Sequence, residues 1–394
     1  MGDIMESLKS IYKIGHGPSS SHTVGPQIAS EIFKNKNSSA DSFRVTLYGS
    51  LALTGKGHLT DQVIKYVLGS NTEIIFNYED ELKHPNTVKF EAILNKEVID
   101  SWTVYSIGGG EIKDDTNLDV PNIDIYQENS MKEIIDYCLN HHISLVEYVD
   151  QYEDINDYLS VVLDTMEDTI QRGLNQEGIL PGGLNVKRRA RDLYNAYLAS
   201  QDIDALVYSI ALAVSEENAS GGLVVTAPTC GSCGVIPAVI SFFKKTKNVS
   251  RQEIINALKV GGIIGLLIRH NASISGAVVG CQGEIGAACS MAAAISTYLL
   301  GGDINKIEYS AEIALEHYLG LTCDPVKGLV QIPCIERNAI SSIKAIASSK
   351  YAMLSDGIHK VSLDEVIKTM KETGLDLSSK YKETAIGGLA KNKQ

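Results

Sequence analysis

The sequence has few aromatic residues and fewer basic than acidic side chains. One tryptophan and six phenylalanines occur in 394 residues, and the formal net charge is −13. Binding to nucleic acid or to an anionic membrane usually requires a basic surface, and aromatic side chains often stack on bases. We therefore expect neither nucleic acid nor a membrane to be a partner of this chain.

Long hydrophobic runs and a recognisable export signal are also missing. The first ten residues carry acids and no apolar core, unlike a signal peptide. The most apolar stretches are 221–240, which Thr, Pro and Gly interrupt, and 260–268, which is too short to cross a membrane. We expect both to be buried core segments and the protein to be cytoplasmic. In that compartment the seven cysteines should be thiols or metal ligands rather than disulfides.

The first part of the chain mixes strand and helix patterns. Alternating apolar residues predict strands at 43–48, 73–78, 88–94 and 102–107, and helical spacing predicts helices at 24–34 and 61–68. This interleaving is typical of a small α/β domain with a mixed or antiparallel sheet. The acidic stretch 112–128 resembles a linker, so the first domain is predicted to span residues 1–127.

From residue 131 onward the patterns are almost all helical. Amphipathic spacing predicts helices at 132–139, 144–171, 188–199, 205–217, 251–268, 285–300, 305–320 and 335–349. The sequence therefore predicts an α+β protein, with a small N-terminal α/β domain followed by a mainly α-helical domain, residues 128–394.

Cys281, Cys289, Cys323 and Cys334 lie close together in this second part. Cys281 and Cys334 precede or begin helical patterns, and Cys323 follows one. A thiolate at a helix N-terminus is favoured by the helix dipole and by free N–H groups, which can also bond the sulfides of a cluster. The spacing alone matches no ferredoxin or zinc-ribbon pattern, so on spacing these residues could equally be buried structural thiols.

The segments around these cysteines resemble the iron–sulfur L-serine dehydratase family. The similar segments near the cysteines are 271–276 (NASISG), 280–284 (GCQGE), 289–293 (CSMAA), 320–325 (GLTCDP) and 328–338 (GLVQIPCIERN). Others are 17–23 (GPSSSHT), 56–61 (KGHLTD), 179–183 (ILPGG), 186–190 (VKRRA) and 226–229 (TAPT). The resemblance extends over nearly the whole chain.

This resemblance implies that Cys281, Cys323 and Cys334 hold a [4Fe–4S] cluster through three irons. The fourth iron would then be open and could act as a Lewis acid on the β-hydroxyl of L-serine while a base removes the Cα proton. The product aminoacrylate would tautomerise to an imine and hydrolyse to pyruvate and ammonia. The resemblance also implies that the chain forms a homodimer, and that the cluster lies in the helical domain.

Two histidines are the candidate bases, and a serine-rich segment is the candidate binding site for the substrate carboxylate. His22 and His58 lie in polar segments, and histidine is the commonest general base. Hydroxyl and N–H groups near His22 suit a carboxylate, and one of these residues should also cap a helix. The substrate-binding candidates are Ser19, Ser20, Ser21, Thr23, Lys56, Asn271 and Ser273. We expect the site to lie between the two domains.

Several features leave alternatives open. Cys230 and Cys233 form a C-x-x-C, but without a thioredoxin-like or zinc context we expect no redox or ligand role. The chain ends without a cysteine, so self-inhibition by a C-terminal thiolate on iron is not expected. The same chemistry on cysteine or threonine, or a cluster-based sensor without turnover, remains an alternative function. A pyridoxal-phosphate enzyme is disfavoured because no lysine has the required setting.

Overall fold

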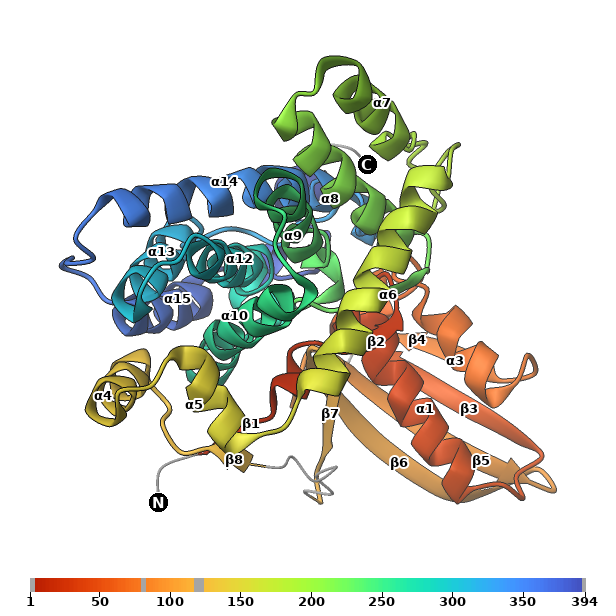
Figure 1. Ribbon diagram of the computed structural model, residues 1–394. Coiled ribbons are helices and arrows are strands. Elements are labelled where there is room, and N and C mark those ends of the chain that lie inside the picture. Colours follow the sequence, from red (N-terminus) through yellow and green to blue (C-terminus); the bar gives the residue numbers. More distant parts are fainter. Residues whose placement is uncertain (1–3, 79–82, 117–123, 392–394) are drawn as a thin grey trace.

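The computed structural model describes residues 4–78, 83–116 and 124–391, and it places a five-stranded sheet beside a larger body of helices (Figure 1). The sheet contains β3 (Ser42–Tyr48), β4 (Glu73–Asn77), β5 (Thr87–Leu94), β6 (Glu97–Gly108) and β7 (Glu111–Asp114). Its order is β4-β3-β5-β6-β7, with β3 and β4 parallel and the other pairs antiparallel. The predicted mixed sheet is therefore confirmed.

Two helices pack against this sheet and close a small core. They are α1 (Gly25–Lys36) and α3 (Thr60–Leu68), with the short α2 (Gly49–Thr54) between β3 and α3. Phe33 of α1 contacts the rings of Phe43 and Phe90 on β3 and β5, and all three side chains are buried. This core is separate from the main core of the helical part.

The helical part is built around α12 (Ile285–Leu299), which is rich in Ala and is buried along nearly its whole length. It packs against α9 (Val235–Lys247), α10 (Arg251–Asn271), α13 (Ile304–Glu316) and α14 (Cys334–Leu354). The remaining helices are α4 (Met131–His141), α5 (Leu145–Tyr152), α6 (Asn156–Asn175), α7 (Ala190–Ser200), α8 (Ile203–Ala219), α11 (Gly276–Val279), α15 (Leu363–Asp376) and α16 (Gly388–Lys391). The α+β prediction is confirmed.

Local sequence signals set several helix boundaries. Ser144, Ser250 and Ser362 each accept a hydrogen bond from the backbone of a glutamate three residues later, and that glutamate bonds back to the serine N–H. Such capping boxes satisfy backbone donors that a helix start leaves free. They start α5, α10 and α15.

The single helix predicted over 144–171 is wrong, because the chain leaves the helix at Glu153. This residue is extended (φ −146°, ψ 140°) between α5 and α6. Its carboxylate accepts hydrogen bonds from Ser7 Oγ, the N–H of Leu8 and the hydroxyl of Tyr126. These long-range contacts offset the loss of helical bonds, and local spacing could not reveal them. Helices α9 and α15 were not predicted, and α13 ends at Glu316 rather than at residue 320.

The N-terminal segment crosses between the two parts. Strand β1 (Met5–Glu6) pairs with β8 (Asp124–Tyr126), and β2 (Ile14–His16) pairs with β9 (Leu223–Val225) of the helical part. Strands thus occupy both ends of the stretch 112–128, and residues 117–123 of that stretch lie outside the described residues. Leu8, Ile11 and Tyr12 are buried in the core of the helical part. The segment between β1 and β2 is thereby held against the helices.

The apolar helices belong mostly to the core. Within the described residues no single helix has the length and apolar character needed to span a membrane, although α10 and the bent segment 276–283 meet that test as a pair. Residues 257–268 of α10 are buried inside the protein.

Candidate active site

Cys281, Cys323 and Cys334 line one cavity, although they come from three different elements. Cys281 lies in the turn before α12, Cys323 lies after α13, and Cys334 is the first residue of α14. The sulfurs of Cys281 and Cys323 and a carboxylate oxygen of Glu284 lie within 4.8 Å of one another. A β-carbon at Gly276 would lie 3.0 Å from Cys323 Sγ, so glycine there allows the backbone to approach the sulfur.

The electrostatic surroundings favour one thiolate in this group. The pKa of Cys281 is lowered to about 6, mainly by a hydrogen bond from the Cys323 thiol and also by the charge of Arg337 and the N–H of Ile285, which together outweigh the effect of burial. Arg337 is held in the cavity wall because it donates to the carbonyl of Thr322 and lies 3.6 Å from Asp324. The N–H that bonds the Cys281 sulfur belongs to Ile285, the first residue of α12, as expected for a thiolate near a helix N-terminus.

Two carboxyl groups share the cavity with the thiols. Loss of water contact and, to a smaller extent, the Cys281 thiolate raise the pKa of Glu284 to about 8. Glu284 accepts a hydrogen bond from Thr229 and lies 3.6 Å from Cys323 Sγ. Burial, together with Glu284 and Cys281, raises the pKa of Glu383 well above its usual range. These pKa shifts favour an ionised Cys281 next to protonated carboxyl groups on Glu284 and Glu383.

Pro18 and Ser19, just before His22, form part of another wall of the cavity together with His58. The predicted residues Ser20, Ser21, His22 and Thr23 lie behind this wall and do not line the cavity. Residues Ser20–Val24 form a π-helical turn, and Ser19 caps it by accepting a hydrogen bond from the N–H of His22. The predicted helix cap within the serine cluster is thus confirmed. Ser19 lines the cavity, and Thr23 donates to the carbonyl of His58.

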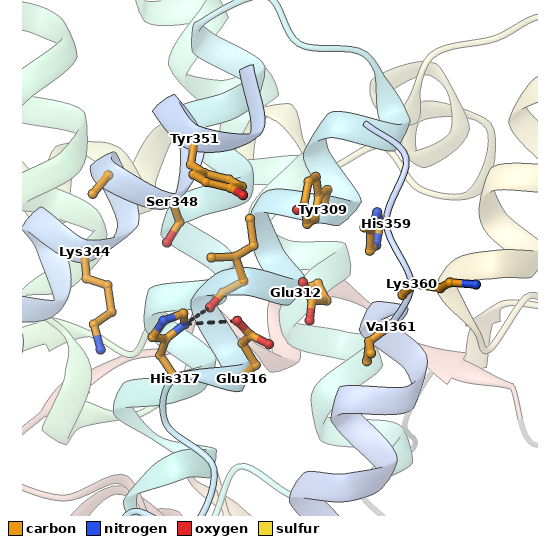
Figure 2. Close-up of a pocket in the computed structure, with 12 residues that line it drawn as sticks. Tyr309, Glu312, Glu316, His317, Lys344, Ser348, Tyr351, His359, Lys360 and Val361 are labelled. Atoms are coloured by element: carbon orange, nitrogen blue, oxygen red, sulfur yellow. Dashed lines mark hydrogen bonds and ion pairs between the residues drawn. The ribbon is translucent and has the colours of Figure 1, made fainter. Parts of the chain in front are cut away.

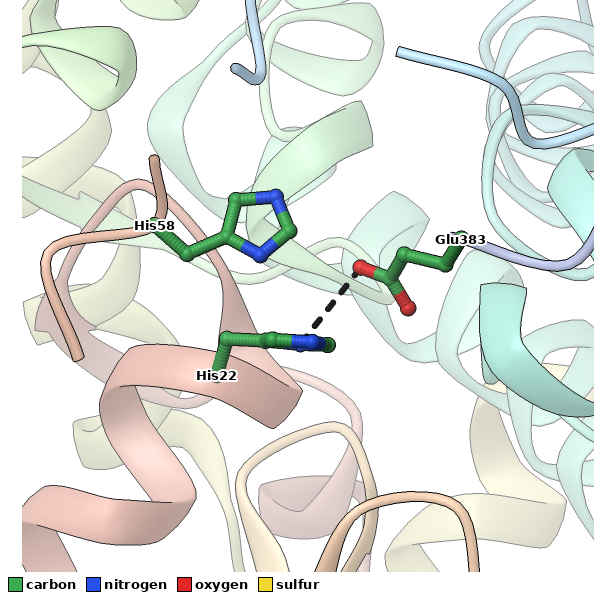
Figure 3. A group of neighbouring side chains, drawn as sticks. All are labelled: His22, His58 and Glu383. Atoms are coloured by element: carbon green, nitrogen blue, oxygen red, sulfur yellow. Dashed lines mark ion pairs between the residues drawn. The ribbon is translucent and has the colours of Figure 1, made fainter. Parts of the chain in front are cut away.

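The proton positions on His22 follow from its partners. Ser50 Oγ donates to the carbonyl of Glu383 at 2.8 Å, and a carbonyl can only accept. His22 Nε2, 3.0 Å from Ser50 Oγ, must therefore carry the proton and donate. Nδ1 is then an acceptor, 2.9 Å from Ser21 Oγ and 3.6 Å from a Glu383 oxygen (Figure 3). Burial lowers the pKa of His22 well below its usual range, which favours this neutral form.

His58 has the opposite tautomer, with a free nitrogen. Thr54 Oγ1 donates to the carbonyl of Ser50, so it can only accept from His58 Nδ1, 3.3 Å away. Nε2 is then unprotonated, and it has no hydrogen-bond partner among the described residues although it is buried. Burial lowers the pKa of His58 to about 3. His58 lines the cavity with the cysteines, and its ring centroid lies 4.4 Å from that of His22 (Figure 3).

The C-terminal segment joins these two walls. The N–H of Cys323 donates to the carbonyl of Tyr381, and the N–H of Glu383 donates to the carbonyl of Cys323. The carbonyl of Glu383 accepts from Ser50, which lies in α2 of the sheet part. One short segment thus contacts both a cysteine of the helical part and the hydroxyl that orients His22.

Other predicted residues lie elsewhere. Lys56 is exposed, and its Nζ lies over the ring of Phe76. Asn271 donates to the carbonyls of Asn129 and Leu267, and Ser273 accepts from the N–H of Ser275. None of these three lines the cavity with the cysteines. The last three residues, part of the C-terminus predicted to lack a cysteine ligand, lie outside the described residues.

The remaining cysteines are buried free thiols. Cys230 and Cys233 form no disulfide, and burial raises both pKa values. Cys289 faces the carbonyl of Ser341 inside the core. Neither Cys230, Cys233 nor Cys289 lines the cavity, although Gly231 does.

Four residues of the site were not singled out from the sequence. Glu284 and Arg337 belong to the segments GCQGE and GLVQIPCIERN, so the motif flanks contained their signal. Ser50 and Glu383 gave no such signal, because they are far apart in the sequence and meet only through the fold.

The donor set suits an iron–sulfur cluster. Three buried or part-buried thiols meet at one cavity, with an arginine and helix N–H groups beside them. Thiolates are the usual ligands of such clusters, and nearby N–H donors bond their sulfurs. If these three thiols held a cluster of four irons, one iron would have no protein ligand.

Comparisons with known proteins point to one family over nearly the whole chain. The sequence profile of the serine dehydratase alpha chain family matches residues 28–390. L-serine dehydratase TdcG of Escherichia coli strain K12 is 42% identical over 448 aligned positions, covering 98% of this chain and 99% of the relative. The L-serine dehydratases of Haemophilus influenzae and Streptomyces coelicolor are 41% and 40% identical, and each alignment covers 98% of this chain. The alignments cover 99% and 98% of these two relatives.

Proposed function

Because this chain belongs to the serine dehydratase family, we propose that it is an iron–sulfur L-serine dehydratase that converts L-serine to pyruvate and ammonia. The observation that supports this most strongly is the cavity itself. It combines three cysteines of the helical part with His58 and Ser19 of the sheet part. The three proposed metal ligands and a candidate base therefore line the same cavity.

The three cysteines are the proposed ligands. Cys281, Cys323 and Cys334 would hold a [4Fe–4S] cluster through their thiolates, and Arg337 would balance part of that negative charge. Bound there, the cluster would supply a Lewis acid for the leaving β-hydroxyl of serine.

His58 is the proposed base. Its Nε2 has a free lone pair at the cavity, and its lowered pKa keeps the ring neutral at working pH. We propose that Nε2 takes the Cα proton, while Ser19 and the serine-rich segment around it hold the substrate carboxylate. His22 bonds Ser50 through Nε2 and Ser21 through Nδ1, so its proposed role is to position that segment. Aminoacrylate then leaves and hydrolyses to pyruvate and ammonia, which balances the loss of water from serine.

The substrate test separates the alternatives. Anaerobically prepared protein should form pyruvate from L-serine with kcat/KM at least about tenfold above that for L-threonine or L-cysteine, since even one extra methyl changes discrimination by about 1–3 kcal/mol. The 2-oxo acid product, pyruvate from serine or cysteine and 2-oxobutanoate from threonine, is measured by its enzymatic reduction with NADH. Turnover of cysteine or threonine alone would assign the chemistry to another substrate, and a protein with a cluster but no turnover would indicate a sensor.

Thr54→Val tests the orientation of His58. Valine keeps the shape of threonine but removes the acceptor for His58 Nδ1–H, so the free lone pair at Nε2 is no longer favoured. Losing one hydrogen bond of about 1 kcal/mol predicts a roughly fivefold lower kcat. Thr54→Ser should restore kcat, and the iron content should stay unchanged in both variants. Equal loss in the serine variant would mean that Thr54 acts through packing alone.

The homodimer, which the family resemblance implies, remains a proposal, and so does the cytoplasmic location. Sedimentation velocity tests the first directly. A monomer at micromolar concentration would contradict it.

A further inference from the structure

A second cavity, of about 590 Å³, lies between α13, α14 and the segment 359–361 (Figure 2). It shares no lining residue with the cavity that contains the cysteines. Its walls contain Glu312 and Glu316 of α13, Tyr351 and Lys344 of α14, and His359. Its chemistry is therefore independent of the proposed dehydratase site.

Three glutamates follow one another on α13 at every fourth residue, so they lie on one face of the helix. Glu308 is satisfied, because it accepts from the N–H of Leu363 and pairs with His359 Nε2 at 2.9 Å. Glu316 is exposed, and His317 Nδ1 lies 3.4 Å from its carboxylate. That nitrogen already donates to the carbonyl of Ile313 at 2.7 Å. Glu316 therefore has only a weak partner.

Glu312 is the exception in this row. Its residue is only 3% exposed, yet no N–H donor or cation of the described chain contacts its carboxylate, and its one hydrogen-bonding neighbour is the carboxyl group of Glu316. Burial and the neighbouring Glu316 and Glu308 raise the pKa of Glu312 to about 8. A largely buried carboxyl group whose only hydrogen-bonding neighbour is another carboxyl group carries an unfavourable interaction whenever both are ionised. A ligand that brings a positive charge would remove this cost.

The walls beside Glu312 suit an organic cation. Tyr309 and Tyr351 lie edge to face with ring centroids 6.1 Å apart, and His359 stacks on Tyr309 at 4.1 Å. Aromatic faces attract ammonium and guanidinium groups. The two lysines of the lining do not fill this role. Lys344 Nζ lies over the ring of Tyr318, and Lys360 points away from the other labelled side chains (Figure 2).

The depth of Glu312 restricts what can reach it. Glu312 as a residue is only 3% exposed and lines the cavity, whereas Tyr351 and Val361 at the cavity wall are 61% and 47% exposed. A slim ammonium head can enter, and the exposed apolar side chains can cover an aliphatic stem. A hydrated divalent ion fits less well, because the carboxylates of this row do not converge as metal ligands do among the described residues.

We propose that this cavity is a binding site for an aliphatic primary amine, whose ammonium group pairs with Glu312 and Glu316 beside the rings of Tyr309 and Tyr351. The site is separate from the proposed active site, so it can be tested on the purified holoprotein whether or not serine is the substrate.

The test uses n-butylammonium chloride as the probe and 1-butanol as its uncharged match. Binding is followed by tyrosine fluorescence and by calorimetry at pH 8. We expect saturable binding of the amine and none of the alcohol at equal concentration. Glu312→Gln keeps the shape but removes the charge, and it should weaken binding at least about tenfold, as expected for loss of a charged hydrogen bond. Glu97→Gln, on the exposed β6 strand, should leave binding unchanged.

Two results would overturn this proposal. The first is an equal affinity for 1-butanol, or an unchanged affinity in Glu312→Gln, because either would make the cavity a non-specific apolar site. The second is no saturable amine binding together with self-association that Glu312→Gln weakens in sedimentation velocity. That result would assign this face to a contact between two copies of the chain.

Discussion

Cys323→Ala is expected to yield a folded protein that holds less iron than the wild type and forms no measurable pyruvate. The sulfur of Cys323 lies within 4.8 Å of both the Cys281 sulfur and a carboxylate oxygen of Glu284. Removing one of three thiolate ligands should release the cluster, because no other cysteine lines the cavity. Cys281→Ala and Cys334→Ala should behave alike. Iron and sulfide content, visible absorbance and pyruvate formation are measured under anaerobic conditions.

Cys289→Ala is the matched control for this series. Cys289 is equally buried and lies in α12, but its sulfur faces the carbonyl of Ser341 rather than the cavity. It should keep its iron and most of its activity. If Cys289→Ala lost the cluster and Cys323→Ala retained it, the three proposed ligands would be wrong.

His58→Gln is expected to lower kcat by about 10²–10⁴-fold, the usual contribution of a general base, with the iron content unchanged. The reason is the unpartnered Nε2 at the cavity, which glutamine cannot replace as a proton acceptor. Because burial lowers the pKa of His58 to about 3, its basic form persists far below pH 6.5. The wild-type kcat/KM should therefore show no loss from His58 titration between pH 8 and 6.

His84→Gln provides the comparison, since His84 bonds the N–H of Asn86 and does not line the cavity. Its kcat should stay within about twofold of the wild type. Full activity in His58→Gln would exclude His58 as the base. A large loss in His22→Gln, with the cluster retained, would then assign proton removal to His22.

Most of the fold follows from short-range signals in the sequence. The alternation in 43–48 and 88–94 predicted β3 and β5, and capping serines mark the starts of α5, α10 and α15. The errors arise where distant contacts decide the structure. Glu153 leaves the helical path to bind Ser7, Leu8 and Tyr126, and no local pattern contains that information.

The site was predictable only in part for the same reason. The motifs around the cysteines and His58 identified groups that the fold brings to one cavity, and His22 lies against the ring of His58 behind the cavity lining. The tautomers of His22 and His58 depend on Ser50 and Thr54, and the link from Ser50 to Glu383 joins residues from opposite ends of the chain. Lys56, Asn271 and Ser273 occur in similar motifs, but the structure gives them other partners.

The central claim is that three thiolates hold an iron–sulfur cluster that acts on serine, and one anaerobic experiment tests it most directly. The wild-type protein is reconstituted with iron and sulfide, its bound iron and sulfide are counted, and pyruvate formation from L-serine is assayed on the same sample. The account predicts a brown protein with about four iron and four sulfide per chain, whose activity rises with cluster content. A colourless protein that forms pyruvate equally well without iron would contradict it.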